Sequence, residues 1–312
     1  MNISENALNI LAAKTFRGIG PAFVNARLAD RPAAETVVAV LADKIPDLTL
    51  PAFRARRDEV RRRVEALGDA VDGVTALGDP DFPPVPASVK PADRPIALFY
   101  RGDIGLLRDA SRNIAVIGLL GPTEAIAADE RKVVAEYVKR GFNVVSGLAL
   151  GCDTVGHRET LACGGRTVAF LASPLNEVNP PSNRPLAAEI VEKGGLLVTE
   201  YYEKAHSRTE FLARYPARDR LQAMYSAQVV LAASYAPNRL GLDSGSRFAL
   251  DKAKAYGIPR AVIYDAARHA DDPMFDLNRV ELAAGARPID VADLAHLPVP
   301  KDRPCLRQAM LL

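Results

Sequence analysis

The chain has 312 residues, of which 48% are hydrophobic and 25% charged, and its formal net charge is +2 at pH 7. This is typical of a soluble globular protein with one large α/β domain and a smaller one, and a polyanionic partner would require clustered basic residues. The three cysteines form no C-x-x-C pair, which excludes a disulfide framework and a zinc ribbon.

Residues 1–70 are expected to form a small helical domain. The N-terminus lacks the features of a signal peptide, and no apolar run is long enough to cross a bilayer, so we expect a cytoplasmic protein without a membrane partner. The apolar spacing of residues 5–30 is helical but is interrupted at Gly18-Ile19-Gly20 and resumes after Pro21. This pattern resembles a helix-hairpin-helix unit, whose turn offers N–H groups to DNA phosphate; a hairpin that only packs on the core is the alternative.

The next two segments carry weaker signals. Residues 53–68 contain six arginines that surround a predicted helix instead of forming one stripe, which favours a solvated helix over a DNA-binding face. Residues 71–95 are dense in proline and are expected to form an irregular connector.

From residue 96 to 298, short apolar runs alternate with amphipathic segments. Continuous apolar runs separated by helices indicate a mainly parallel sheet covered on both faces, so we predict an α/β, Rossmann-like, doubly wound domain, followed by a tail over residues 299–312. The runs are 96–100, 114–117, 142–145, 167–171, 196–198, 229–233 and 261–264, and helices are expected at 125–139, 185–193 and 248–256.

Ligands of such a sheet bind outside the carboxyl ends of its strands. In the turn after residue 145, Gly147 and Gly151 are expected to let the backbone approach a ligand closely, and Asp153 is the expected N-cap of the next helix. Asp153 and His157 lie four residues apart, so a hydrogen bond between them is expected. Cys152 and His157 are too few to hold a metal ion, and no metal site is predicted.

Basic residues cluster further along the chain. Four arginines fall within residues 208–220, and the guanidinium fork suits phosphate oxygens. Ser246 is an expected N-cap, and Arg247 beside it places a cation at the positive end of a helix dipole, which favours a bound anion there. A solvated Arg247 is the alternative. Nearby tyrosines, including Tyr201 and Tyr215, are candidate stacking faces for bases.

Several ordered motifs resemble the DNA-processing protein A family (DprA/Smf). The pattern S-G-x-A-x-G-x-D-x-x-x-H fits residues 146–157, and G-G-x-T, P-P-x-N-R, [ST]-E-Y, F-P-x-R-N-R and S-G-S have counterparts at 164–167, 180–184, 199–201, 215–220 and 244–246. The resemblance implies a non-catalytic protein without a cofactor that binds single-stranded DNA and loads the recombinase RecA during natural transformation. With the basic residues above, it implies a DNA or phosphate site of Gly118, Thr123, Ser146, Gly147, Gly151, Asp153, Asn183, Arg184, Arg214, Arg218, Arg220, Ser244, Gly245, Ser246 and Arg247.

The chain departs from the family pattern at two turns. Gly118-Leu119-Leu120 stands where the family has G-S-R, and Asp219 stands where it has an asparagine. Losing one arginine and gaining one carboxylate is expected to remove about 2–4 kcal/mol of phosphate attraction. Two alternatives therefore stay open: a nucleotide-sensing protein, and a scaffold that has lost DNA binding and acts through protein contacts, for which Leu119 and Leu120 are candidates. A homodimer is also compatible with the sequence.

Overall fold

The computed structural model describes residues 1–238 and 245–300, and within this part of the chain the backbone forms a ten-stranded sheet of order β1-β2-β3-β7-β6-β5-β4-β8-β9-β10. Strand β3 is antiparallel to both of its neighbours, and all other pairs are parallel. The strands are β1 (Asn2–Ile3), β2 (Gly73–Ala76), β3 (Ala97–Gly102), β4 (Asn113–Ile117), β5 (Asn143–Ser146), β6 (Thr167–Phe170), β7 (Leu196–Thr199), β8 (Gln228–Leu231), β9 (Arg260–Ile263) and β10 (Arg287–Ile289).

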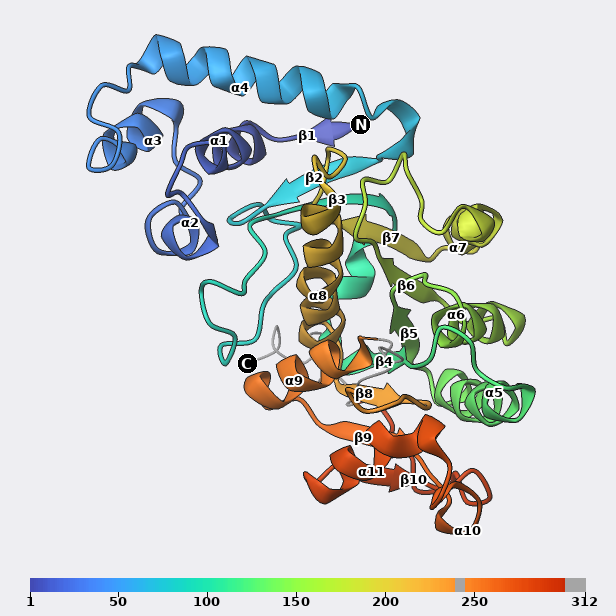
Figure 1. Cartoon of the computed structure of the whole chain (residues 1–312). Coiled ribbons are helices and arrows are strands. Elements are labelled where there is room, and N and C mark those ends of the chain that lie inside the picture. Colours follow the sequence, from blue (N-terminus) through green and yellow to red (C-terminus); the bar gives the residue numbers. More distant parts are fainter. Residues whose placement is uncertain (239–244, 301–312) are drawn as a thin grey trace, which may run out of the picture.

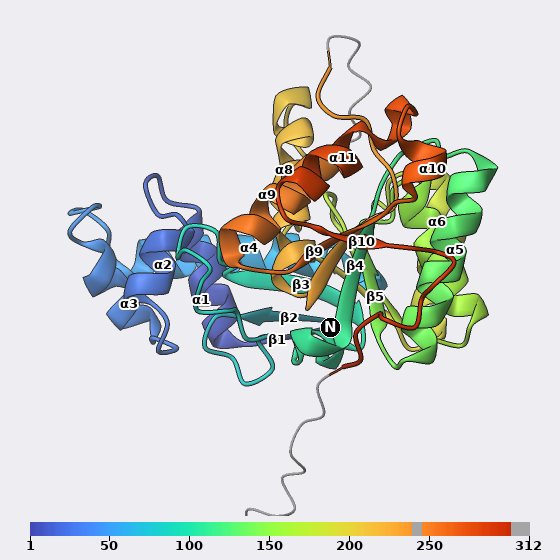
Figure 2. The same cartoon turned by 90° about the horizontal axis from the view of Figure 1, so that it is seen from below.

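The central strands are apolar on both sides because helices cover both faces of the sheet. In β4, Ile114 and Val116 point into one hydrophobic core, whereas Ala115 and Ile117 point into another. Helices α5 (Glu124–Lys139), α6 (Cys152–Ala162) and α7 (Arg184–Glu192) cover the first face, and α8 (Arg208–Met224) and α9 (Ser246–Tyr256) cover the second (Figure 1). Figure 2 shows α8 and α9 on the side of the sheet opposite to α5 and α6. The predicted mainly parallel, doubly wound fold is confirmed.

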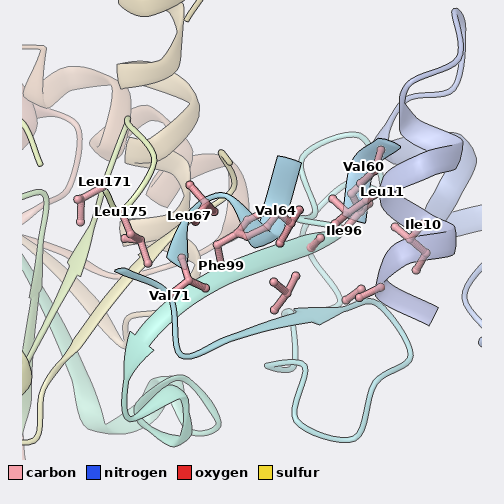
Figure 3. Close-up of a cluster of buried hydrophobic side chains, with 14 of the residues drawn as sticks. Ile10, Leu11, Val60, Val64, Leu67, Val71, Ile96, Phe99, Leu171 and Leu175 are labelled. Atoms are coloured by element: carbon pink, nitrogen blue, oxygen red, sulfur yellow. The ribbon is translucent and has the colours of Figure 1, made fainter. Parts of the chain in front are cut away.

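Four N-terminal helices pack at the β1–β2–β3 end of the sheet (Figure 1). They are α1 (Glu5–Lys14), α2 (Pro21–Arg27), α3 (Ala34–Leu41) and α4 (Leu50–Glu65). Their apolar side chains join those of the sheet in one cluster, so that Ile10 and Val64 belong to the same core as Phe99 and Leu171 (Figure 3). The short strand β1, at the start of the helical segment, pairs with β2.

The proline-rich segment is more regular than its composition suggests. Strand β2 lies within it, and the Asp79 carboxylate accepts hydrogen bonds from Ser4 Oγ, Asn6 Nδ2 and Ala76 N at 2.9–3.0 Å. These bonds tie the connector to the first helix. The predicted boundaries of the helical domain, the connector and the sheet domain remain predictions.

The arginines of α4 contact carboxylates of neighbouring segments. Arg57 and Arg61 both contact Glu5, at 2.8 and 2.7 Å, and Arg54 contacts Glu35 at 2.7 Å. These contacts favour the interpretation of α4 as a solvated helix. Helices α10 (Ala266–His269) and α11 (Asp276–Ala283) complete the end of the sheet that carries β9 and β10. No described helix is both long and apolar enough to cross a membrane.

The order in which the chain adds strands to the sheet reverses at β4. From β4 the chain proceeds through β5, β6 and β7 on one side, and it then returns to β8 on the other side of β4. The connections on the two sides of such a strand diverge, which leaves a crevice outside its carboxyl end. The fold therefore places the expected ligand site outside β4 and β8.

Candidate nucleic-acid interface

A cavity of about 730 Å³ lies outside the carboxyl ends of the parallel strands. Its lining comes from the turns that follow β4, β5 and β6 and from helices α8 and α9, which are far apart in the sequence. The volume is within the range of small-molecule sites, about 300–1,000 Å³. The point at which the strand order reverses, at β4, therefore coincides with an open cavity.

The turn between β5 and α6 is folded around the Asp153 carboxylate. Asp153 Oδ2 accepts hydrogen bonds from Gly147 N at 3.0 Å and from Ala149 N at 3.2 Å. Two residues of this turn, Leu148 and Gly151, have positive φ angles of 59° and 72°. The expectation that Asp153 is the N-cap of α6 is wrong: Gly151 occupies the cap, and Asp153 lies in the first turn of the helix.

Glycines of this region are required by contacts with protein atoms. A Cβ at Gly147 would overlap the Arg218 guanidinium, and a Cβ at Gly151 would overlap the backbone of Leu119 and Leu120. Gly118 lines the cavity, and a Cβ there would lie 2.6 Å from Cys152 Sγ. Gly147 and Gly151 thus allow close packing of the turns on the protein itself. Gly147 also lines the cavity, and its predicted close approach to a ligand stays a prediction.

His157 does not contact Asp153, so the expected hydrogen bond between them is wrong. His157 Nδ1 lies 2.7 Å from Thr167 Oγ1, and that hydroxyl donates to Val144 O at 2.8 Å. Nδ1 is therefore the donor to Thr167, because the hydroxyl hydrogen is already used. Burial, and to a smaller extent the charge of Arg218, lowers the pKa of His157 to about 3, which makes this side chain a neutral structural group.

Cys152 and Glu130 are also buried and neutral. Burial raises the pKa of the Cys152 thiol, and it raises the pKa of Glu130 well above the usual range of a carboxyl group. Both side chains are almost fully buried in the structure. Cys152 and His157 therefore form no reactive Cys–His pair.

Two predicted site residues hold the turns in place. The buried Ser146 donates through Oγ to Val116 O at 2.7 Å, which ties β5 to β4. The buried Asn183 donates through Nδ2 to Leu148 O at 2.9 Å and to Thr154 Oγ1 at 2.8 Å. Because these polar groups bond within the protein, they are expected to shape the cavity and not to contact phosphate.

Two of the α8 arginines lie in the interior and contact carboxylates of the protein itself, the mostly buried Glu200 and the half-exposed Glu210. Arg220 contacts both oxygens of Glu200 at 2.7 Å and donates to Asp93 O at 2.8 Å. Arg214 contacts Glu210 at 2.6 Å, and its guanidinium lies 4.1 Å from the centre of the Tyr201 ring. Both side chains are buried and neither lines the cavity. These ion pairs and the burial of both side chains argue against the predicted contact with phosphate.

Arg218 does reach the cavity, but it is surrounded by acceptors. It lies 3.0 Å from Asp219 and 3.8 Å from Asp153, and its Nη1 donates to Phe170 O at 3.2 Å. With its amide oxygen facing the donors, Gln222 accepts a further bond from Nη1 at 2.8 Å. Two carboxylates therefore face one guanidinium at the floor of the cavity.

The remaining predicted residues lie around the cavity or beyond it. At the start of α9, Gly245 is the cap with a φ of 81°, so the prediction that Ser246 is the N-cap is wrong; Ser246 Oγ instead donates to Gly118 O at 3.2 Å. The Arg247 guanidinium lies 4.1 Å from the centre of the Phe248 ring. Ser244 lies outside the described residues.

Thr123 caps α5 by accepting a hydrogen bond from Ile126 N at 3.3 Å. Thr123 does not line the cavity. Arg184 is exposed at the start of α7, three residues after Pro181, which does line the cavity.

The apolar walls of the cavity include residues that sequence reasoning missed. Among these are Leu150, Phe211, Leu212 and Phe248, which contribute to the lining together with Tyr215. Phe211 and Tyr215 lie four residues apart on α8, and their rings pack edge to face with centroids 5.3 Å apart. The helical spacing of residues 211, 215, 218 and 222 was the available signal, because it places these side chains on one face of α8.

Comparison with known proteins identifies the family of this cavity-bearing fold. The model of the DNA recombination-mediator protein A family matches residues 73–290, which is well over half of the chain. The chain belongs to this family. The recombination-mediator protein A match begins at β2 and ends with β10, and it includes every turn that lines the cavity.

Solved structures of similar proteins agree with this assignment. The structure of DNA processing protein A (DprA) from Streptococcus pneumoniae aligns with a TM-score of 0.72 at 22% identity, over 96% of this chain and 99% of that one. The DNA processing protein A of Helicobacter pylori aligns with a TM-score of 0.54 at 25% identity, over 70% of this chain and 92% of that one. The Helicobacter pylori protein is described as having a unique single-stranded DNA binding mode.

Curated relatives in the recombination-mediator protein A family carry the names Smf and DprA. Protein Smf of Synechocystis is 35% identical over 156 residues, which cover 49% of this chain and 37% of that relative. Protein Smf of Borreliella burgdorferi is 27% identical over 209 residues, which cover 67% of this chain and 60% of that relative. The match thus spans between about a third and six tenths of the length of these relatives.

Proposed function

We propose that this chain binds single-stranded DNA at the cavity outside β4 and β8 and acts without catalysis in DNA uptake and recombination. The observation that carries the proposal is the cavity itself, because its aromatic and apolar walls suit an unstacked base, and unpaired strands expose such bases. Membership of the recombination-mediator protein A family and the DNA-binding relative from Helicobacter pylori support the choice of ligand. Delivery of the bound strand to RecA is part of the proposal.

Phosphates are expected to bind at the rim and not at the floor. Arg184, Arg208 and Arg247 each lie within three residues of a cavity-lining residue, and Arg184 and Arg208 are exposed. The floor, in contrast, carries two carboxylates beside the single guanidinium of Arg218. A strand that crosses the rim therefore places its charges against these arginines while one base enters the cavity.

Replacing Arg184, Arg208 and Arg247 together with alanine is expected to weaken binding and reduce its salt dependence. For a single strand, each phosphate that the protein no longer neutralises reduces the slope of log K against log salt by about 0.7, so the slope of the triple variant should be smaller by about two units. Fluorescence anisotropy with a labelled oligonucleotide over a salt series measures this slope.

Lys139→Ala is the control, because Lys139 lies at the far end of α5 from the cavity and is exposed. The Lys139→Ala variant should keep the wild-type slope. If the triple variant kept the wild-type slope of log K against log salt, these three arginines would not be the phosphate-binding residues. Absence of salt-sensitive binding by the wild-type protein at low ionic strength would contradict the proposed function itself.

A nucleotide-sensing function is the second candidate, because the cavity volume also fits a single nucleotide. Thermal-shift measurements separate the two candidates. A nucleotide sensor should be stabilised by one mononucleotide at low concentration, whereas a DNA-binding protein should be stabilised by oligonucleotides and much less by any mononucleotide.

A further inference from the structure

The floor of the cavity has an unusual charge balance for a protein that binds DNA. The charged residues in its described lining are Asp153, Arg218 and Asp219. Arg218 lies between the two carboxylates, 3.8 Å from Asp153 and 3.0 Å from Asp219. With both carboxyls ionised the cluster has a net negative charge, which repels a phosphate from this part of the cavity.

Of the three groups, Asp219 has the most capacity left for a ligand. Asp153 Oδ2 already accepts from Gly147 N and Ala149 N, and Arg218 Nη1 already donates to Phe170 O. Asp219 contacts Arg218 but accepts no hydrogen bond from any described residue, and 14% of its side chain remains accessible. An ionised carboxylate has about four lone-pair positions and no donor, so Asp219 selects ligands that present N–H groups.

The walls above this carboxylate suit a flat, weakly polar group. Leu120, Leu150 and Leu212 are exposed by 56%, 49% and 54%, and each contributes to the cavity lining. Phe211, Tyr215 and Phe248 add aromatic surface. A nucleobase combines a planar face for these walls with a hydrogen-bonding edge for the floor.

We propose that Asp219 makes the cavity selective for nucleobases that present N–H donors, with guanine preferred and thymine disfavoured. This inference rests on the proposed function, since it requires that a strand place a base in the cavity. Guanine presents the adjacent N1–H and N2–H donors to one carboxylate, whereas adenine and cytosine each present one amino group. Thymine presents a single N3–H between two carbonyl oxygens, and these oxygens repel the carboxylate.

The selectivity is expected to depend on pH. Burial raises the pKa of Asp219 to about 6; Arg218 opposes this shift and Asp153 adds to it. His157, on α6, stays neutral because burial and the charge of Arg218 lower its pKa to about 3. Asp219 therefore accepts hydrogen bonds as a carboxylate at about pH 8, whereas at about pH 5 it is protonated and can donate to a thymine oxygen.

The test compares oligonucleotides of about 20 nucleotides that differ only in base, by anisotropy at about pH 8. An alternating guanine–thymine strand should bind about tenfold more tightly than oligo-thymidine. The same strand with hypoxanthine in place of guanine lacks the N2 amino group, and it should lose part of this preference without any change to the protein.

Asp219→Asn should reduce the preference to about twofold or less, mainly by tighter binding of oligo-thymidine, because an amide both donates and accepts. Asp271→Asn is the control, since Asp271 is exposed and does not line the cavity. For the wild-type protein, lowering the pH to about 5 should reduce the base preference to the same extent as the Asp219→Asn substitution does.

Equal affinity of the wild-type protein for all these strands would overturn the selectivity and leave the proposed function intact. Absence of binding to any strand would overturn both. If Asp219→Asn fails to fold, the hypoxanthine comparison still decides, because an unchanged affinity on loss of the N2 amino group contradicts the pairing with Asp219.

Discussion

Replacing Arg220 with alanine is expected to lower the free energy of unfolding by about 3–5 kcal/mol, because it leaves the Glu200 carboxylate buried without its partner. The Arg220 and Glu200 side chains are each only 10% exposed, and they share two hydrogen bonds of 2.7 Å. Arg220 also connects α8 to the connector through Asp93 O. Urea denaturation followed by circular dichroism measures the change.

The double variant Arg220→Met with Glu200→Leu is the informative comparison. Removing both charges avoids an uncompensated buried ion, so this variant should be more stable than Arg220→Ala. The exposed pair of Arg54 with Glu35 serves as the control, and its loss should leave the unfolding midpoint nearly unchanged. If Arg220→Ala proved as stable as wild type yet lost DNA binding, Arg220 would be a DNA ligand after all.

Gly151→Ala is expected to destabilise the fold by about 2–6 kcal/mol and to abolish binding at the cavity. Gly151 has a φ of 72° and a ψ of −127°, where an alanine costs about 1–3 kcal/mol, and forced overlap in a packed region adds about 1–3 kcal/mol. The overlap is with the backbone of Leu119 and Leu120, which no change of side-chain rotamer relieves. The turns after β4 and β5 would therefore have to separate.

Gly164→Ala is the control for an alanine at positive φ that overlaps no other atom. Gly164 has almost the same φ, 71° against 72°, but a Cβ there meets no atom within 4 Å. Its replacement should cost only the conformational part, about 1–2 kcal/mol, and should leave DNA binding unchanged. Equal effects of the two substitutions on stability and binding would show that the contact between the turns is unimportant.

The sheet could be predicted from the sequence because its signal is local. The strands of the parallel part are short apolar runs buried on both faces, as in β4, so composition alone marks them. Strand β1 has only two residues, and it becomes a strand only by pairing with β2, about seventy residues later. No local sequence pattern predicts such a pairing.

The site was predicted less well because burial depends on partners from distant segments. Arg214, Arg218 and Arg220 look alike in sequence, but Glu200 after β7 retains Arg220 in the interior, whereas Arg218 reaches the cavity floor. Gly151, with its positive φ, occupies the cap position of α6, and the Asp153 carboxylate accepts hydrogen bonds from Gly147 N and Ala149 N. Asp219 was recognised as a departure from the family pattern, but only the cavity shows what it faces.

The proposed entry of a single-stranded DNA base into this cavity can be tested by filling the cavity without changing its charge. Ala149 lines the cavity, and Ala149→Trp occupies its volume while leaving Asp219, Arg218 and the rim arginines in place. Ala213→Trp, at an exposed position of α8 outside the lining, is the matched control. We expect Ala149→Trp to lose most of the affinity for single-stranded DNA and Ala213→Trp to retain it. Wild-type affinity in a folded Ala149→Trp variant would show that no base enters the cavity.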